Sequence, residues 1–244
     1  ILLKDRYLLT DENPEELFMR VAKNVAKIEV QYGGEAARSQ RDFYQLMSQL
    51  DFLPSSTVLM NAGTPKGQLF ACYALPVGDS LESIFSAVKN QAILQHSCSG
   101  TGFNLSKIRQ HGATVKGREG VAVGPMGFLK LFDGVAGTVL QGGKRPGANM
   151  GILRVDHPDI MAFIEQKQRA TLTNFNLSVG LTEAFMSAVE KDEEYTLKDP
   201  KSGKAVQRLH ARHVFDLMIL NAWKTGDPGI LFLDRIQFSR SNPI

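Results

Sequence analysis

The first fifty residues show a hydrophobic pattern with the period of an α-helix. Asp11 or Asn13 can cap a helix that has Pro14 in its first turn. The apolar positions that follow share one face of this helix: Leu17, Phe18, Val21, Ala22, Val25 and Ile28. Gly33 and Gly34 predict its end, and a second amphipathic segment runs from residue 38 to residue 50. Residues 1–53 are therefore predicted to form a small helical domain.

From Pro54 onward, short apolar runs alternate with segments of helical period. The runs predict strands at residues 69–77, 102–106, 149–155, 175–181 and 229–234, and the other segments predict helices at 81–96, 126–140, 158–168, 183–191 and 211–225. Residues 195–206 hold the turn sequence Asp199-Pro200-Lys201-Ser202-Gly203, which predicts a hairpin. Alternation of strand and helix indicates an α/β fold, a mostly parallel sheet covered by helices, over residues 54–244.

Composition narrows the classes of function. The net charge is only +3, from 28 Lys and Arg against 25 Asp and Glu, which does not favour binding to nucleic acid or to an anionic membrane. No apolar run approaches the roughly 20 residues that a bilayer span needs. Two cysteines in 244 residues suggest a reducing, cytoplasmic setting. The first residues include neither an initiator Met nor a signal peptide, so the chain is expected to begin inside a longer protein.

Glycines gather in one part of the chain, where they could cradle phosphates. Thirteen of the 22 lie between Gly100 and Gly151. One glycine-containing loop, at residues 97–102, is either a phosphate-binding turn or an ordinary tight turn. A second loop, at residues 141–149, carries Lys144 and Arg145 and is either a nucleotide-binding loop or a solvated turn. Its glycine spacing differs from that of a Walker loop.

Three further features each have two interpretations. Asp79 begins the sequence Asp-Ser-Leu-Glu, which predicts a capping box with Asp79 as the cap. Arg109 and Lys116 belong to a basic segment that is either an anion site or a solvated face. Cys72 lies in an apolar run typical of a buried strand, where a thiol usually acts as a small hydrophobe. The chain has no CxxC pair, and His157, His210 and His213 each lack a metal-ligand partner four residues further on, so no metal site is predicted.

Taken together and in order, nine segments are similar to one family. They are FLPSS at 52–56, MNAGTP at 60–65, QLFAC at 68–72, GDSLESI at 78–84, SGTGF at 99–103, QGGKR at 141–145, GANMGILRVDHPDI at 147–160, TNFN at 173–176 and PGILFLDR at 228–235. In this order they resemble the large catalytic subunit of ribonucleotide reductase. The sequences of the segments are most similar to those of the adenosylcobalamin-dependent class. The resemblance runs through nearly the whole chain.

The resemblance implies a fold and a reaction. The fold is a ten-stranded α/β barrel after a helical domain, of which this chain would supply the helical domain and the first half-barrel. In the family, a thiyl radical removes a hydrogen from the ribose and a pair of thiols supplies the electrons, becoming a disulfide. Cys72 matches the first thiol of that pair, which replaces its interpretation as a core residue. The resemblance also implies an enzyme with thioredoxin or another thiol as reductant.

The resemblance also assigns residues to two nucleotide sites and to a loop that links them. The matching substrate positions are Ser56, Ala71, Cys72, Ser99, Gly100 and Gly102. The positions matching the specificity site, where a deoxynucleoside triphosphate or ATP acts as effector, are Asp79, Ser80, Leu81, Arg109 and Lys116. The loop that links this effector site to the substrate base matches Gln141, Lys144, Arg145 and Asn149. Helices 81–96 and 126–140 are expected to pair with a second subunit in a homodimer.

The sequence departs from the family pattern in three places. Cys98 stands where glycine is common, and Pro146 follows Lys144 and Arg145 where a Thr-Arg-Arg run is common. The chain also ends before the expected radical cysteine, its Asn and Glu partners and the second redox thiol. Most cobalamin contacts are expected there too, so this fragment alone should bind nucleotide without reducing it. The alternative is a nucleotide-binding regulatory module without catalysis; a dinucleotide-dependent dehydrogenase is disfavoured because no Gly-x-Gly-x-x-Gly follows the first predicted strand.

Overall fold

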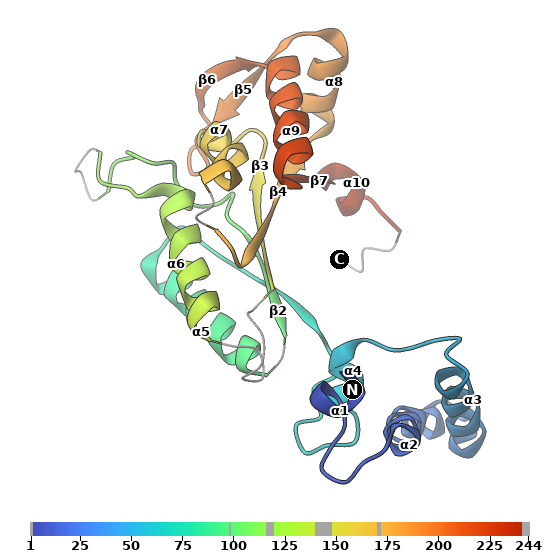
Figure 1. The fold of residues 1–244 in the computed structure, drawn as a ribbon. Coiled ribbons are helices and arrows are strands. Elements are labelled where there is room, and N and C mark those ends of the chain that lie inside the picture. Colours follow the sequence, from blue (N-terminus) through green and yellow to red (C-terminus); the bar gives the residue numbers. More distant parts are fainter. Residues whose placement is uncertain (1, 98, 116–119, 140–147, 170–171, 241–244) are drawn as a thin grey trace. The chain divides into compact units, whose positions relative to one another are not determined.

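The computed structural model describes residues 2–97, 99–115, 120–139, 148–169 and 172–240. The chain divides into two compact units (Figure 1). One comprises Ile1–Cys72 with Ser97–Ser99, and the other comprises Tyr73–His96 with Gly100–Ile244. The first unit continues past residue 53 and includes a short helix, Ser56–Asn61. The domain boundary at residue 53 stays a prediction.

The first unit is helical. Its elements are α1 (Leu2–Arg6), α2 (Pro14–Ala26), the 3-10 helix η1 (Lys27–Tyr32), α3 (Ala36–Ser48) and α4 (Ser56–Asn61). Asn13 caps α2 in a capping box with Glu16, as Asn13 Oδ1 accepts from the Glu16 N–H at 3.0 Å and Glu16 Oε2 accepts from the Asn13 N–H at 2.9 Å. The apolar face of α2 packs into a small core with residues of α3 and α4: Leu17, Phe18, Val21, Ala22, Met47 and Leu59.

The second unit is built on a five-stranded sheet. Its strands are β1 (Cys72–Leu75), β2 (Gly100–Asn104), β3 (Asn149–Arg154), β4 (Phe175–Leu181) and β7 (Gly229–Phe232), in the order β1-β2-β3-β4-β7. The β2–β3, β3–β4 and β4–β7 pairs are parallel. β3 and β4 alternate with helices in the chain and are largely buried, as parallel strands must be. The prediction of an α/β unit with a mostly parallel sheet is confirmed.

Helices separate the strands along the chain. They are α5 (Leu81–His96), α6 (Gly124–Thr138), α7 (Ile160–Ile164), the 3-10 helix η2 (Gln166–Arg169), α8 (Glu183–Lys191), α9 (Ala211–Thr225) and α10 (Leu233–Gln237). α5 lies beside α6, and α8 lies beside α9 (Figure 1). The predicted hairpin is confirmed: β5 (Glu194–Lys198) pairs antiparallel with β6 (Ala205–His210).

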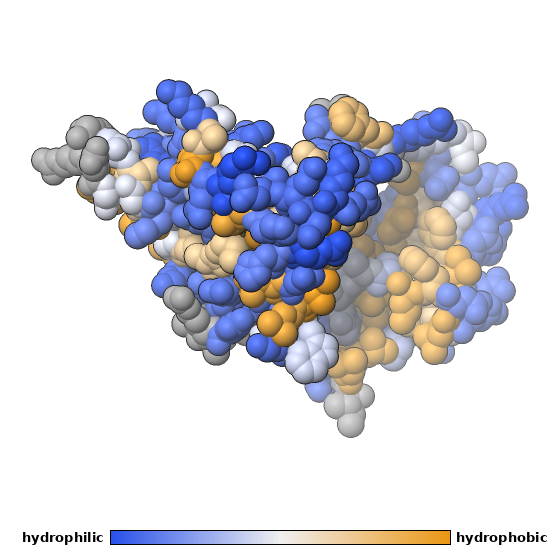
Figure 2. All heavy atoms as spheres, turned by 90° about the horizontal axis from the view of Figure 1, so that it is seen from above, coloured by the Kyte–Doolittle hydropathy of each residue, from blue (hydrophilic) through white to orange (hydrophobic). Residues whose placement is uncertain are grey.

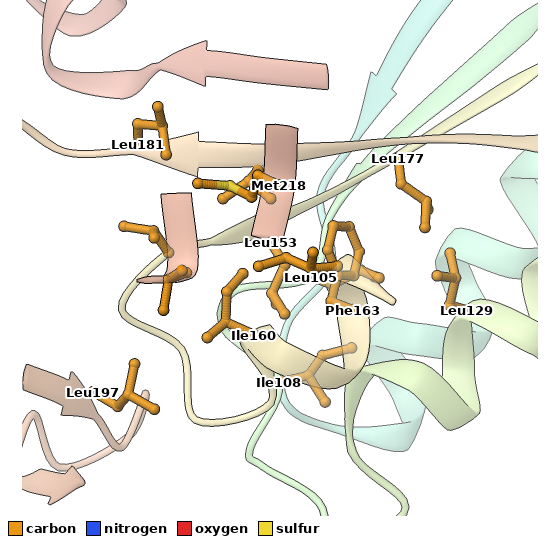
Figure 3. Packing of buried hydrophobic residues seen from close by; sticks show 14 of the residues in the cluster. Leu105, Ile108, Leu129, Leu153, Ile160, Phe163, Leu177, Leu181, Leu197 and Met218 are labelled. Atoms are coloured by element: carbon orange, nitrogen blue, oxygen red, sulfur yellow. The ribbon is translucent and has the colours of Figure 1, made fainter. Parts of the chain in front are cut away.

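The main core fills the space between the sheet and its helices. Phe103 of β2 stacks on Phe132 of α6 with ring centroids 4.3 Å apart, and Phe175 of β4 is 5.9 Å away. All three rings are at most 1% exposed. Figure 3 shows another part of the same core, where residues such as Leu153 of β3 and Phe163 of α7 come from consecutive elements and pack together. The turn before α5 and the loop after β2, which carry the candidate site, are both attached to this core.

Some predicted boundaries were wrong. The predicted helix at 158–168 is two short pieces, α7 and η2, and the predicted strand at 69–77 shortens to β1. Pattern reasoning missed α1, α4 and α10, which have five or six residues each and are too short to show a full helical period. Cys98 itself and the residues 140–147 lie outside the described residues.

Polar side chains cover much of the face shown in Figure 2, with apolar groups between them. None of the helices in the described ranges is long and apolar enough to cross a membrane.

Candidate functional site

An ion pair between Asp79 and Arg109 forms the centre of the site. Asp79 lies in the turn before α5, and Arg109 lies in the loop after β2. Arg109 Nη2 is 2.7 Å from Asp79 Oδ2, and Arg109 Nε donates to the same oxygen at 2.8 Å. The Arg109 N–H also donates to Asp79 Oδ1 at 3.0 Å. The hydrogen bond to Asp79 raises the pKa of Arg109 above its usual value, so the guanidinium stays charged and held in one orientation.

This ion pair changes the cap of α5. Ser80 Oγ accepts from the Ser83 N–H at 3.1 Å, and the Ser80 carbonyl accepts from the Ile84 N–H at 3.0 Å. Ser80 is therefore the cap, and the predicted capping box with Asp79 as the cap is wrong. The reason is that the Asp79 carboxylate accepts from the guanidinium and from the backbone N–H of Arg109, which leaves the cap position to Ser80.

The loop that carries Arg109 is held by a buried histidine. His157 is 2% exposed; its Nε2 donates to the Ile108 carbonyl at 2.8 Å, and its Nδ1 accepts from the Asp159 N–H at 3.0 Å. Asp159 in turn accepts from the His111 N–H at 2.9 Å through Oδ2. The backbone on both sides of Arg109 is thus fixed to the segment after β3. The sequence alone contains no pattern that identifies this role of His157.

A cavity of 730 Å³ opens beside the ion pair. This volume is in the range of about 300–1,000 Å³ that is typical of small-molecule sites. Four predicted effector residues line it: Asp79, Ser80, Leu81 and Arg109. The structure therefore brings together residues that are thirty positions apart in the chain. The fifth predicted effector residue, Lys116, lies outside the described residues.

The rest of the cavity wall was not expected from the sequence. Most of it is apolar and comes from α5, α6 and the segment between β2 and α6: Ile84, Phe85, Ile108, Val115, Val121, Ala122, Val123 and Phe128. Lys201, from the turn between β5 and β6, also lines it. A more polar cavity of 710 Å³, lined by Gln110, Thr114, Asp199 and Ser202 among others, shares Arg109 and Lys201 with the first. The turn was recognised in the sequence, but no local pattern links it to Arg109.

The predicted redox cysteine is accessible. Cys72 begins β1, and its thiol is free and exposed. The interpretation of Cys72 as a small buried hydrophobe is therefore wrong; the reason is that β1 is only half covered, with exposed and intermediate positions in alternation. Ala71 before it is half-buried.

The other predicted substrate residues lie in both units. In the first unit, Ser99 is fully buried, and its Oγ donates to the Phe70 carbonyl at 3.2 Å and accepts from Gln68 Nε2. The segment just before Cys72 is therefore tied to Ser99. Ser56 is half-buried at the start of α4. Gly100 and Gly102 belong to β2 in the second unit. A common site for these residues stays a prediction.

Asn149 anchors the end of the predicted linking loop. It is the first residue of β3 and is 5% exposed. Its Oδ1 accepts from Gln95 Nε2 and from Thr101 Oγ1, both at 2.6 Å, and its Nδ2 donates to the Asn174 carbonyl at 2.9 Å. The side chain thus joins the end of α5 to the sheet. Gln141, Lys144 and Arg145 lie outside the described residues, and a contact of this loop with a base stays a prediction.

Within the described ranges, no group of three or more His, Cys, Asp or Glu side chains is placed to hold a metal ion. The second unit thus holds an ion pair beside a cavity of small-molecule size, and the exposed Cys72 belongs to the first unit.

Comparison with family models identifies the class of protein to which this fold and site belong. Residues 2–67 match the ribonucleotide reductase all-alpha domain, and residues 70–243 match the ribonucleotide reductase barrel domain. The chain belongs to the ribonucleotide reductase family. The predicted fold class, a helical domain followed by the first half of a barrel, is confirmed by these matches together with the five-stranded parallel sheet.

Individual relatives agree with this assignment. The chain is 48% identical over 214 residues to a vitamin B12-dependent ribonucleoside-diphosphate reductase of Thermoplasma acidophilum, a match that covers 87% of this chain and 28% of the relative. It is 44% identical over 252 residues to a protein of the same name from Mycobacterium tuberculosis, covering 100% of this chain and 35% of the relative. A Helicobacter pylori ribonucleoside-diphosphate reductase subunit alpha is 28% identical over 275 residues. The chain spans about a third of the length of these relatives.

Proposed function

We propose that the full-length protein containing this chain reduces ribonucleotides to deoxyribonucleotides for DNA synthesis. In this proposal the chain contributes an effector site and one redox thiol. The observation that carries it is the cavity at the Asp79–Arg109 ion pair, because four residues assigned to the effector by resemblance line one nucleotide-sized space. The family assignment and the names of the relatives support the reaction class.

The cavity suits a deoxynucleoside triphosphate or ATP. Its apolar wall, which includes Phe85 and Phe128, can cover the face of a base, and Arg109 supplies a fixed positive charge for phosphate. Asp79 and Ser80 add oxygen atoms that can accept from sugar hydroxyls or base amino groups. The side chains that would contact the effector are therefore already held in place by the fold.

α5 offers a route from the effector to the substrate loop. Its first residue, Leu81, lines the cavity, and Gln95 near its other end donates to Asn149, where the loop at 141–149 enters β3. A helix of 16 residues spans roughly 24 Å. Coupling between two ligands requires an element that both sites can bias. α5 and the loop residues Gln141, Lys144 and Arg145 would provide this element.

The proposed chemistry uses Cys72 as an electron donor. A thiyl radical on another cysteine takes the ribose 3′ hydrogen and returns it at the end, the 2′ hydroxyl leaves as water, and two thiols become a disulfide. Two electrons and two protons thus pass from the thiol pair to the substrate. The thiol of Cys72 is exposed, which leaves it open to an external reductant of the thioredoxin type. Its partner thiol and the radical cysteine would come from other parts of the protein.

The relatives named as vitamin B12-dependent make adenosylcobalamin the proposed radical source. When bound, it would supply the radical that starts the reaction. The corrin ring of this cofactor holds the cobalt, so the protein would supply a large binding surface, and the two large cavities of the second unit are assigned here to the effector. We therefore assign most of the cofactor contacts to other parts of the protein.

Substrate contacts and partners complete the proposal. Ser56, the Ala71–Cys72 backbone, Ser99, Gly100 and Gly102 would bind the ribonucleotide. α5 exposes Phe85 and Ile93, which are 52% and 55% exposed, and α6 lies beside it. This pair of helices would contact a second subunit in a homodimer. The proposed location is the cytoplasm, where thiol reductants are available.

The test is a product assay on the full-length protein. Ribonucleoside di- and triphosphates are incubated with adenosylcobalamin and dithiothreitol, with and without each deoxynucleoside triphosphate, and deoxyribonucleotides are measured by chromatography. Product that depends on cobalamin is the expected result. The assay is repeated with a separate metal-containing radical subunit in place of cobalamin. If the protein binds effector but forms no product under either condition, a regulatory module is favoured and the proposal is overturned.

A further inference from the structure

We infer that Lys201, on the turn between β5 and β6, binds the phosphates of the effector together with Arg109. The two large cavities of the second unit have two lining residues in common, and these are Arg109 and Lys201. Both are cations. Two positive side chains therefore lie where a mainly apolar cavity meets a polar one. A nucleotide with its base and sugar in the apolar cavity would place its phosphates at this boundary.

Arg109 has little hydrogen-bonding capacity left for an anion. Its Nε and Nη2 are bound to the Asp79 carboxylate, and its Nη1 donates to the Thr114 carbonyl at 3.2 Å. Lys201, in contrast, forms no ion pair with any described carboxylate within 4.0 Å. Its ammonium group can therefore offer three donors to phosphate oxygens.

The acids around the two cavities make a second cation important for an anionic ligand. The described acids that line the 730 Å³ cavity are Asp79 and Glu82, and Asp199 lines the polar cavity. Arg109 and Lys201 are the described bases of both linings. Lys201 therefore doubles the positive charge that faces a phosphate at the boundary between the cavities, where acids would otherwise dominate.

The turn that carries Lys201 is held in one conformation. Asp199 Oδ1 accepts from the Lys201 N–H at 3.2 Å, from the Ser202 N–H at 2.6 Å and from Ser202 Oγ at 2.7 Å. These bonds lower the pKa of Asp199, with the Ser202 hydroxyl as the largest cause. Asp199 is thus kept ionised to hold the turn. A rigid turn reduces the entropy that is lost when its lysine binds a ligand.

The hairpin is fixed to the sheet near the segment that positions Arg109. The Lys198 N–H donates to the Asp156 carbonyl at 2.8 Å. Asp156 directly precedes His157, whose Nε2 holds the Ile108 carbonyl. Both cations are therefore positioned from the same short segment after β3, so their separation is set by the fold.

This inference rests on the proposed function, because it names a further contact of the same effector site. The test measures binding of dATP, dGTP, dCTP and dTTP to the full-length protein by isothermal titration calorimetry. Lys201→Ala should weaken all four by a similar factor of about 10- to 100-fold, on the scale of a hydrogen bond between charged groups. A similar loss is expected because phosphates are common to all four. Lys201→Arg should recover most of the affinity.

Lys204→Ala is the matched control, since Lys204 lies in the same turn but lines neither cavity. It should bind all four nucleotides as the wild type does. Equal affinity of Lys201→Ala and wild type would overturn the inference, and if Arg109→Ala binds weakly in the same series, the proposed effector site survives. Absence of binding to the wild-type protein would overturn both. The thermal unfolding midpoint of each variant checks that the fold is intact.

Discussion

Asp79 and Arg109 are thirty residues apart in the chain, and their side chains meet with Oδ2 and Nη2 separated by 2.7 Å. Both side chains are partly buried, with 22% of Asp79 and 25% of Arg109 exposed. The pair joins the start of α5 to the loop after β2 and forms one corner of the 730 Å³ cavity. An ion pair at this depth orients the guanidinium while leaving the cavity open to a ligand.

Removal of the Arg109 guanidinium should weaken effector binding. Arg109→Ala is expected to cost about 1.5–3 kcal/mol of binding free energy, the scale for hydrogen bonds to charged groups. Calorimetric titration of the full-length protein with each deoxynucleoside triphosphate measures this cost. Arg154→Ala is the matched control, because Arg154 also pairs with an aspartate, Asp156 at 2.8 Å, but lines neither large cavity. Unchanged affinity in Arg109→Ala would remove Arg109 from the site.

Cys72→Ser should separate catalysis from effector binding. The thiol is exposed, so its replacement leaves the core untouched, and exposed substitutions typically change stability by less than about 0.5 kcal/mol. Multiple turnover with a thiol reductant should be lost, while the affinity for effector stays within a factor of two or so of the wild type. Cys98→Ser is the control and should retain turnover. Full turnover in Cys72→Ser would contradict the role of Cys72 as a reducing thiol.

How much could be predicted from the sequence differs between elements. α5, α8 and α9 and the strand β4 have the predicted bounds, because each is long enough to show its period and ends at a clear turn signal. α4 and α7 are too short to show a helical period. Their form depends on the core: Leu59 and Phe163 are buried by tertiary contacts.

The site was less accessible to local reasoning than the fold. Local pattern favoured a helix cap for Asp79, a solvated face for Arg109 and a buried strand for Cys72, and only the ordered resemblance assigned them chemistry. The reason is that a helix cap and an ion pair compete for the Asp79 carboxylate. Which of the two forms depends on Arg109, in a loop thirty residues away. Lys201 shows the same limit, because its place beside Arg109 follows from tertiary structure alone.

The buried His157 should make stability depend on pH. Burial lowers the pKa of His157 below its ordinary value of 6.5, and both ring nitrogens are bonded in the neutral form. Between the folded and the unfolded pKa, the unfolded state therefore binds more protons. The free energy of unfolding should fall as the pH drops through about 6.5, and the fall should end below the folded pKa.

Urea unfolding midpoints of the full-length protein between about pH 5 and pH 8 test this expectation against His157→Gln, which keeps a donor for the Ile108 carbonyl but does not titrate. The variant should lose less stability on acidification than the wild type. His213→Gln, at an exposed position on α9, should follow the wild type. Identical pH profiles for wild type and His157→Gln would contradict the linkage.

The aromatic group at the centre of the second unit should dominate its stability. Phe103 is completely buried and stacks on Phe132. Phe103→Ala is expected to lower the free energy of unfolding by about 3–5 kcal/mol, from lost burial and a residual cavity. Circular dichroism during urea unfolding measures it. Tyr32→Ala, at a position 83% exposed, should change stability by less than about 0.5 kcal/mol. A loss in Phe103→Ala no larger than in this control would argue against the core described above.

Selection of the substrate by the effector is the direct test of whether the cavity at Asp79 and Arg109 is a regulatory site. The full-length protein is given all four ribonucleotides at equal concentration, with one deoxynucleoside triphosphate at a time, and the ratio of the four deoxyribonucleotide products is measured. In the wild type, each effector should change this ratio, because the cavity at Asp79 and Arg109 is proposed to select the substrate. In Arg109→Ala the change should need much higher effector concentrations. A wild-type product ratio that no effector alters would contradict the account.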